Sequence, residues 1–258
     1  MKIQMLPSTI DENGVASVRQ HLLSIIIDDR VAIDAGCLAF SCSELQRKQV
    51  RDIILTHTHL DHIAGLPIYI DDLFASLTEP VRVHATRKMI DILERDLFNW
   101  EIYPRFSDLS NENGPVVKYV EFSLGDAFNV KHLNIRSVPV NHKVSASGYI
   151  VSDKDCSVLI TGDTAETDDI WDICNNTPDI RAAFVECAFP NEMSDLARVS
   201  DHLTPDRLVR ELDKIRDRKF PVYILNIKPM YRETVIEQLT AADLPQVEVL
   251  TIGKVYEF

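Results

Sequence analysis

Residues 55–62 read Leu-Thr-His-Thr-His-Leu-Asp-His, and a run of β-branched residues comes directly before them. That run predicts a strand that leads into a loop. His57 and His59 are two residues apart, so both side chains point to the same side of an extended chain. Asp61 and His62 follow where a helical pattern begins. Imidazole and carboxylate groups are preferred ligands of zinc and related divalent metals, so this stretch predicts a metal site.

Further candidate ligands lie near the ends of other predicted strands. His142 and Asp163 come after β-branched runs, Asn226 lies in another such run, and His202 lies in the loop before a predicted helix. An aspartate after a glycine is typical of a turn, and a single histidine is typical of a protein surface. The positions after strands favour functional roles instead, because such loops often carry functional residues.

Strand and helix patterns alternate along the chain and predict an α/β fold. The predicted strands are Leu22–Ile27, Val31–Ile33, Ile53–Leu55, Val81–Val83, Ile135–Val140, Val158–Ile160, Ala183–Val185 and Val222–Ile227. The predicted helices are Thr86–Trp100, Asp168–Cys174, Pro205–Ile215 and Arg232–Leu239. No linker rich in proline, glycine or serine interrupts the pattern. We therefore predict one domain over residues 1–258, with sheets covered by helices.

The composition argues against several classes of protein. The formal net charge is −13, and a surface this negative repels phosphate backbones, so general nucleic-acid binding is not expected. The five cysteines include no C-x-x-C pair, which is typical of free thiols in a reducing compartment. Residues 1–14 lack the apolar core of a signal peptide, and no apolar run is long enough to span a bilayer. We expect a cytoplasmic protein without membrane attachment.

The spacing of the candidate ligands, H-x-H-x-D-H over residues 57–62 followed by His142 and Asp163, resembles the metallo-β-lactamase superfamily. Asp34-Ala35-Gly36 resembles an early strand-turn of that superfamily, in which the aspartate lies beneath the metal site. Within the superfamily the chain is most similar to class II cyclic-nucleotide phosphodiesterase-like proteins. The motifs that carry this similarity are THLDHIAGLP (58–67), FNW (98–100) with YP (103–104), GDT (162–164), ECAFPN (186–191), HLTP (202–205) and IKP (227–229).

The resemblance implies a four-layer αββα sandwich with a metal site at one edge of the paired sheets. It also implies one or two divalent ions, zinc first, with manganese or iron as alternatives. By this resemblance Asp34 lies beneath the metal site and supports its ligands, and Asp163 bridges two metals. The first metal is expected on His57, His59 and His142, and the second on Asp61 and His62.

The chain departs from the family pattern at two places. Relatives carry a histidine before the Ile227-Lys228-Pro229 motif, and this chain has Asn226 there. An amide oxygen is a poor zinc ligand compared with imidazole, so we expect Asn226 to be a weak metal ligand or a substrate contact. The second metal is then weaker, replaced by manganese, or absent. Residues 5–14 also lack the glycine-rich turn of relatives, which alters one wall of the expected pocket.

The resemblance predicts a metal-dependent hydrolase, most simply a phosphodiesterase that attacks a cyclic nucleotide or a related small diester with a metal-bound hydroxide. Asp61 and His202 are the predicted catalytic residues: the aspartate acts at the metal, and the histidine donates to the phosphate or the leaving oxygen. One alternative is hydrolysis of another ester, a thioester or a lactone. A second is a catalytically weak, metal-bound protein that binds a nucleotide or a partner. Assembly into a homo-oligomer is left open.

Overall fold

The computed structural model describes residues 1–258, which divide into two compact units. We call Lys2–Ser123 with Ile252–Glu257 the N-terminal unit. Leu124–Thr251 with Met1 and Phe258 is the C-terminal unit. The single domain expected over residues 1–258 stays a prediction.

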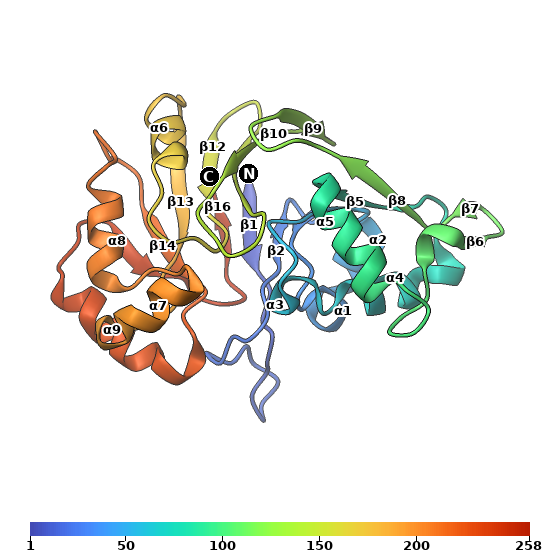
Figure 1. Cartoon of the computed structure of the whole chain (residues 1–258), viewed down its shortest axis with the longest axis horizontal. Coiled ribbons are helices and arrows are strands. Elements are labelled where there is room, and N and C mark those ends of the chain that lie inside the picture. Colours follow the sequence, from blue (N-terminus) through green and yellow to red (C-terminus); the bar gives the residue numbers. More distant parts are fainter. The chain divides into compact units, whose positions relative to one another are not determined.

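The N-terminal unit contains a seven-stranded sheet in the order β16-β1-β2-β3-β4-β5-β8 (Figure 1). Its strands are β1 (Lys2–Met5), β2 (Ile25–Ile27), β3 (Val31–Ile33), β4 (Asp52–Ile54), β5 (Val81–Ala85), β8 (Val117–Glu121) and β16 (Val255–Glu257). The pairs from β16 to β3 are antiparallel, and those from β3 to β8 are parallel. The hairpin of β6 (Ser110–Asn111) and β7 (Gly114–Pro115) stands apart from this sheet.

Helices cover this sheet because its central strands are buried along their whole length. Strands β2, β3 and β4 have no exposed position, so they are nearly continuous apolar runs and do not alternate with polar residues. Helix α4 packs Leu66, Tyr69 and Ile70 into the same core. The helical segments of the unit are α1 (Leu38–Ser41), α2 (Glu44–Gln49), α3 (Leu60–Ile63), α4 (Leu66–Leu73), α5 (Arg87–Ile92), the 3₁₀ turns η1 (Phe74–Ser76) and η3 (Phe106–Asp108), and the π-helix η2 (Leu93–Leu97).

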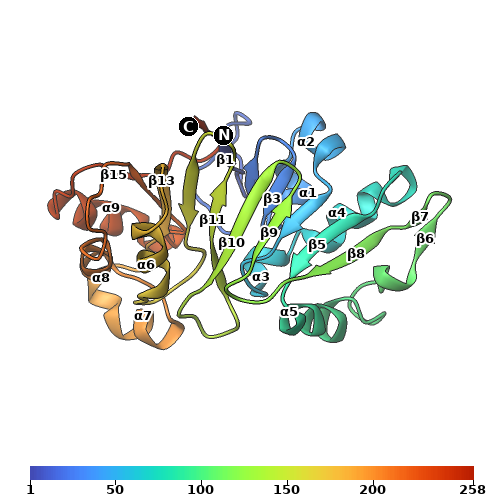
Figure 2. The ribbon, with the colours of Figure 1, turned by 90° about the horizontal axis from the view of Figure 1, so that it is seen from above.

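The C-terminal unit also contains a seven-stranded sheet, in the order β15-β14-β13-β12-β11-β10-β9. Its strands are β9 (Ala127–Val130), β10 (Leu133–Pro139), β11 (Ser147–Ser152), β12 (Ser157–Ile160), β13 (Ile180–Glu186), β14 (Val222–Leu225) and β15 (Val247–Val249). Strands β9 to β12 pair antiparallel. Figure 2 shows β9, β10 and β11 side by side. Strands β12 to β15 pair in parallel.

Three helices of the C-terminal unit share a buried core with its sheet, namely α6 (Asp169–Asn175), α8 (Pro205–Leu212) and α9 (Arg232–Ala241) (Figure 1). Trp171 of α6 and Leu208 of α8 lie in this core with Val222 of β14. Helix α7 (Ser194–Ser200) and the 3₁₀ turns η4 (Asn191–Met193) and η5 (Pro229–Tyr231) lie in the loops that follow β13 and β14. No helix in the structure is both long enough and apolar enough to cross a membrane.

The predicted strands are confirmed, with limits that are shorter at some ends and longer at others, but the helix predicted over Thr86–Trp100 is wrong in its last three residues. The α-helix ends at Ile92 and the π-helix at Leu97, and a turn follows. The Asn99 side chain accepts hydrogen bonds from the backbone N–H groups of Glu101 and Ile102. This local bonding replaces helical hydrogen bonds and ends the helix.

The strand directions explain where functional residues gather. Parallel neighbours β3 and β4 end at the same edge of the N-terminal sheet, followed by Asp34 and by the loop that contains His57. In the C-terminal sheet, β12, β13 and β14 are parallel and likewise end at one edge. Strand β10 is antiparallel to β11, which is antiparallel to β12, so β10 ends at that edge too. Ligands of α/β proteins bind at such carboxyl ends.

Candidate metal centre

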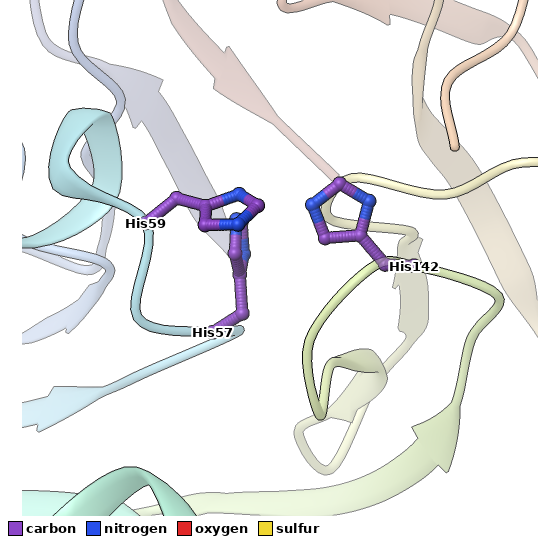
Figure 3. A group of neighbouring side chains, drawn as sticks. All are labelled: His57, His59 and His142. Carbon is purple, nitrogen blue, oxygen red and sulfur yellow. The ribbon is translucent and has the colours of Figure 1, made fainter. Parts of the chain in front are cut away.

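Three histidines lie against one another in the N-terminal unit, on the loop between β4 and α3 and on α3 itself. The ring centroids of His57 and His59 are 4.6 Å apart, and those of His57 and His62 are 4.1 Å apart. Figure 3 shows the rings of His57 and His59 on this loop. Asp61 lies in the first turn of α3, and its backbone carbonyl accepts a hydrogen bond from Leu23 N. The structure therefore brings the rings of His57, His59 and His62 together, and the metal-binding role of this stretch stays a prediction.

Asp34 lies beneath these histidines and is fully buried. Its carboxylate accepts hydrogen bonds from the Thr56 backbone N–H at 2.8 Å and from the Thr56 hydroxyl at 2.7 Å. His62 Nδ1 lies 2.7 Å from the same carboxylate. Burial raises the pKa of Asp34, and the hydrogen bonds from His62 and Thr56 oppose that rise. Asp34 thus orients the candidate ligand His62, and its role beneath a metal stays a prediction.

The C-terminal unit brings together three more of the predicted residues. Candidate ligand atoms of His142, Asp163 and His202 all lie within 4.8 Å of one another. His142 follows β10 (Figure 3), and its Nδ1 lies 3.0 Å from the backbone carbonyl of Asp201. Asp163 follows β12 and is 2% exposed. A carboxylate and two imidazoles at this spacing fit a divalent cation.

His202 is held by a second buried carboxylate, Glu186, at the end of β13. His202 Nδ1 lies 2.9 Å from Glu186 Oε1, which also accepts hydrogen bonds from the backbone N–H groups of Thr164 and Leu203. Burial raises the pKa of Glu186, and the neighbouring His202 opposes that rise. Burial lowers the pKa of His202, but Glu186 and Asp163 outweigh it, so the pKa lies above its ordinary value. The pair therefore favours a protonated histidine at the edge of the sheet.

Asn226 and Lys228 lie in the loop after β14. The Asn226 amide nitrogen donates a hydrogen bond to Asp163 Oδ1 at 2.7 Å, and the backbone of Asn226 is left-handed, with φ of 56°. Lys228 lies close enough to His202 that its charge opposes protonation of that ring. The structure thus places Asn226 directly beside a predicted ligand.

The hydrogen bonds fix one tautomer in each of four histidines. The Thr56 hydroxyl donates to Asp34, so it accepts from His57 Nδ1 at 3.0 Å. The acceptors at the other three Nδ1 atoms are carboxylate or carbonyl oxygens, on Asp34 for His62, on Asp201 for His142 and on Glu186 for His202. The neutral rings of His57, His62 and His142 then carry their proton on Nδ1 and their lone pair on Nε2, whereas His202 donates from Nδ1 to Glu186 in either protonation state. This is the arrangement that an oxygen partner imposes on histidines that bind metal, so the residues fit a divalent ion.

Two functional contacts were not predicted. Glu186 was noted only as part of a family motif, although a carboxylate that ends a buried apolar strand is a recognisable signal. The carbonyl of Asp201 could not be identified, because nothing in a sequence shows which backbone oxygen faces a ring.

Comparison with known proteins places the chain in a family. A sequence model described as "Beta-lactamase superfamily domain" matches residues 30–222, about three quarters of the chain. The chain belongs to the β-lactamase superfamily. The yeast PDE1 structure matches with a TM-score of 0.76 at 16% identity and covers 98% of each chain. The "metallo-beta-lactamase fold protein YhfI from Bacillus subtilis" matches with a TM-score of 0.72 at 13% identity and covers 99% of this chain and 98% of that one. The predicted fold class, the αββα sandwich of this superfamily, is confirmed.

Curated relatives of this superfamily member have two kinds of name. A protein of Yersinia pestis named "Probable 3',5'-cyclic-nucleotide phosphodiesterase" is 25% identical over 214 residues, 72% of this chain and 60% of the relative. A protein of Erwinia tasmaniensis named "Ribonuclease BN" is 24% identical over 156 residues, 55% of this chain and 47% of the relative. The chain therefore spans about half to three fifths of the length of these relatives. The predicted likeness to cyclic-nucleotide phosphodiesterases is confirmed at the level of family resemblance.

Proposed function

We propose that the chain is a metal-dependent hydrolase of phosphodiesters and that its substrate is a small diester such as a cyclic nucleotide. The observation that carries the proposal is the buried pair of His202 and Glu186, whose hydrogen bond fixes an imidazole beside Asp163 and His142 and raises its pKa. A proton donor next to a metal ligand suits an anionic substrate whose leaving oxygen must be protonated. The relatives named phosphodiesterase and ribonuclease support the same bond type.

The ligands of the proposed metal centre are assigned as family membership implies. A divalent ion bound by them would lower the pKa of its water to about 7 and would supply a nucleophile at neutral pH. Zinc is the first choice, with manganese or iron as alternatives. The proposed ligands are His57, His59 and His142 for the first ion, Asp61 and His62 for a second ion, and Asp163 for both.

The residues of the chain divide the remaining work. Asp61 orients the attacking water and receives its proton, because a half-buried carboxylate at the start of α3 is an acceptor only. His202 donates a proton from Nε2 to the leaving oxygen while Glu186 holds Nδ1. Asp34 keeps His62 in position and does not touch the substrate.

A small diester is favoured over RNA by charge. The net charge of −13 opposes the approach of a polyanion over long range, whereas a metal reverses the field only locally. Hydrolysis of another ester, a thioester or a lactone is the alternative chemistry for the same ligands. A metal-bound protein without efficient turnover is the second alternative.

The test is turnover by metal-stripped protein reloaded with zinc, manganese or iron. The substrates are bis(p-nitrophenyl) phosphate, 3',5'-cyclic AMP, a short RNA and a lactone. We expect diester hydrolysis that requires added metal. Turnover of the lactone with inert diesters would establish the alternative chemistry, and metal binding without any turnover would establish the binding protein.

Variants separate the roles of the residues. Asp61→Ala and Asp163→Ala should each reduce diester hydrolysis at least 100-fold, the scale on which a positioned acid or base acts. His202→Ala should lower kcat to a similar extent without changing metal content, and loss of metal in this variant would make His202 a ligand. His132→Ala is the matched control, because this exposed histidine belongs to the same unit and lies in the turn between β9 and β10.

A further inference from the structure

The side chain of Asn226 faces a predicted metal ligand through its amino group. Asn226 Nδ2 lies 2.7 Å from Asp163 Oδ1. The other oxygen of the same carboxylate, Asp163 Oδ2, lies 4.0 Å from His202 Nδ1. The two oxygens of Asp163 therefore have different surroundings, one with an amide donor and one toward the imidazole.

The chemistry of the two groups fixes which atom of the amide is in contact. An ionised carboxylate only accepts hydrogen bonds, so the Asn226 atom at 2.7 Å is the NH₂ donor and not the carbonyl oxygen. The carbonyl oxygen is the atom of asparagine that binds hard metals. The geometry consequently presents Asp163 with a hydrogen-bond donor at the place where relatives carry an imidazole.

The backbone holds Asn226 in this position. Its φ of 56° is left-handed, a conformation in which asparagine, aspartate and histidine are enriched. Asn226 directly follows β14, and Asp163 follows β12. Strand β13 lies between these two strands in the sheet, and all three run in parallel, so both residues lie at the same sheet edge. The hydrogen bond therefore joins two loops of one rigid sheet and is set by the fold.

We propose that Asn226 is a positioning residue that clamps Asp163 by a hydrogen bond and replaces a metal ligand, so that the centre binds one divalent ion tightly and lacks a tight second site. The inference rests on the metal centre of the proposed function. A hydrogen bond to Oδ1 uses one of the two lone pairs of that oxygen and makes it a weaker ligand, so Asp163 acts as a ligand mainly through Oδ2. A carboxylate used in this way cannot bridge two ions as strongly as one with both oxygens on metals.

The test is the number and affinity of bound ions, measured by calorimetric titration of metal-stripped protein with Zn²⁺ and Mn²⁺ and by elemental analysis. The parent should bind one ion tightly. Asn226→Gly removes the donor without backbone strain and should keep one ion, at 10- to 100-fold lower affinity, the usual effect of losing a partner of a ligand. Asn226→Asp places two carboxylates against each other, which a cation relieves, and should bind a second Mn²⁺ at least 10-fold more tightly than the parent.

The control is Asn175→Asp, which adds the same charge in the C-terminal unit and removes an amide hydrogen bond to the Lys214 carbonyl. It should leave both stoichiometry and affinity unchanged. Two tight ions in the parent, with one lost in Asn226→Gly, would show that Asn226 is a ligand and overturn the inference. Identical titrations for the parent and both Asn226 variants would overturn it as well. A parent that binds no ion at all would instead refute the proposed function, so the two failures are distinguishable.

Discussion

Gly36 gives the sharpest test of how the fold positions the ligand loop of the N-terminal unit. A β-carbon added at this residue would lie 1.9 Å from the backbone carbonyl oxygen of Asp61 and 2.8 Å from both the backbone N and O of Leu23. Ordinary contacts between such atoms are above 3 Å, so at least one backbone segment must move by about 1 Å or more. All three neighbours are backbone atoms, which cannot rotate away as a side chain can. Gly36→Ala therefore shifts the start of α3.

The energetic cost follows from the same contacts. Overpacking a well-packed interior costs about 1–3 kcal/mol. The hydrogen bond from Leu23 N to Asp61 O, 2.8 Å long, is lost or lengthened, which adds about 1 kcal/mol. We expect Gly36→Ala to lower the free energy of unfolding by about 2–4 kcal/mol in urea titrations of metal-free protein. Because His59, a proposed ligand of the first ion, directly precedes α3 and moves with it, zinc affinity should fall at least 10-fold.

Gly114→Ala is the matched control. No atom lies within 4 Å of a β-carbon at Gly114, but its φ of 120° strains any other residue. This variant should lose about 1–3 kcal/mol of stability, as Gly36→Ala does, and keep its zinc affinity. A competition titration with a zinc chelator measures both variants. If Gly36→Ala binds zinc within two-fold of the parent, the loop does not depend on this close approach and the reasoning fails.

Two further predictions concern charge. Arg82→Met should cost about 3 kcal/mol at pH 7, because Asp52 is 3% exposed and loses guanidinium contacts of 2.7 and 2.8 Å. Burial raises the pKa of Asp52, but Arg82 and His84 outweigh burial and hold the pKa far below its ordinary value. The stabilisation by the Asp52–Arg82 ion pair is therefore complete above about pH 4 and disappears as the pH falls. In urea titrations the difference between parent and variant should be equal at pH 6 and 8 and shrink below pH 4; a difference that grows in acid contradicts the assignment. Chelation should abolish diester hydrolysis and zinc should restore it. Bound zinc should be released as the pH falls, because protons compete with zinc for the histidine ligands, and elemental analysis after gel filtration would show this.

The sequence predicted the elements that are buried and apolar, and failed where packing overrides local preference. Strand β11 was not predicted, since Ser147 and Gly148 are unfavourable in strands. The structure shows why the glycine is needed. A β-carbon at Gly148 would lie 2.5 Å from the Ile170 side chain of α6, so the helix packs on this strand only because the side chain is missing. A contact between residues this far apart in the chain leaves no local pattern.

The candidate site was predictable to the extent that ligands have a characteristic residue type and position. Histidines and aspartates after β-branched runs could be identified, and so could the departure at Asn226. What Asn226 does was not predictable, because the same residue can offer a donor or an acceptor and only its contact with Asp163 decides. Glu186 lacked a predicted role for a similar reason: its partner His202 is distant in sequence and meets it only at the sheet edge.

Three of the ten non-glycine residues with left-handed backbone contact candidate ligands. The residues are Asp34 with φ of 58°, Asp201 with φ of 54° and Asn226 with φ of 56°. Their partners are, in the same order, His62, His142 and Asp163. This conformation costs about 1–2 kcal/mol for most residues, and aspartate and asparagine tolerate it better than others.

The recurrence has a physical reason. A left-handed residue turns the chain sharply, so its own polar group faces back over the sheet edge toward a neighbouring loop. In each case the partner is fixed by a hydrogen bond within its own unit, which sets the tautomer of a ring or the orientation of a carboxylate before any ion binds. Ordering of side chains normally reduces the net affinity of a site, so ligands that are already ordered bind an ion more tightly. Asp34→Gly should therefore weaken zinc binding in a competition titration although it relieves the backbone, because it removes the carboxylate that holds Thr56, the partner of His57. Unchanged affinity would contradict this reasoning.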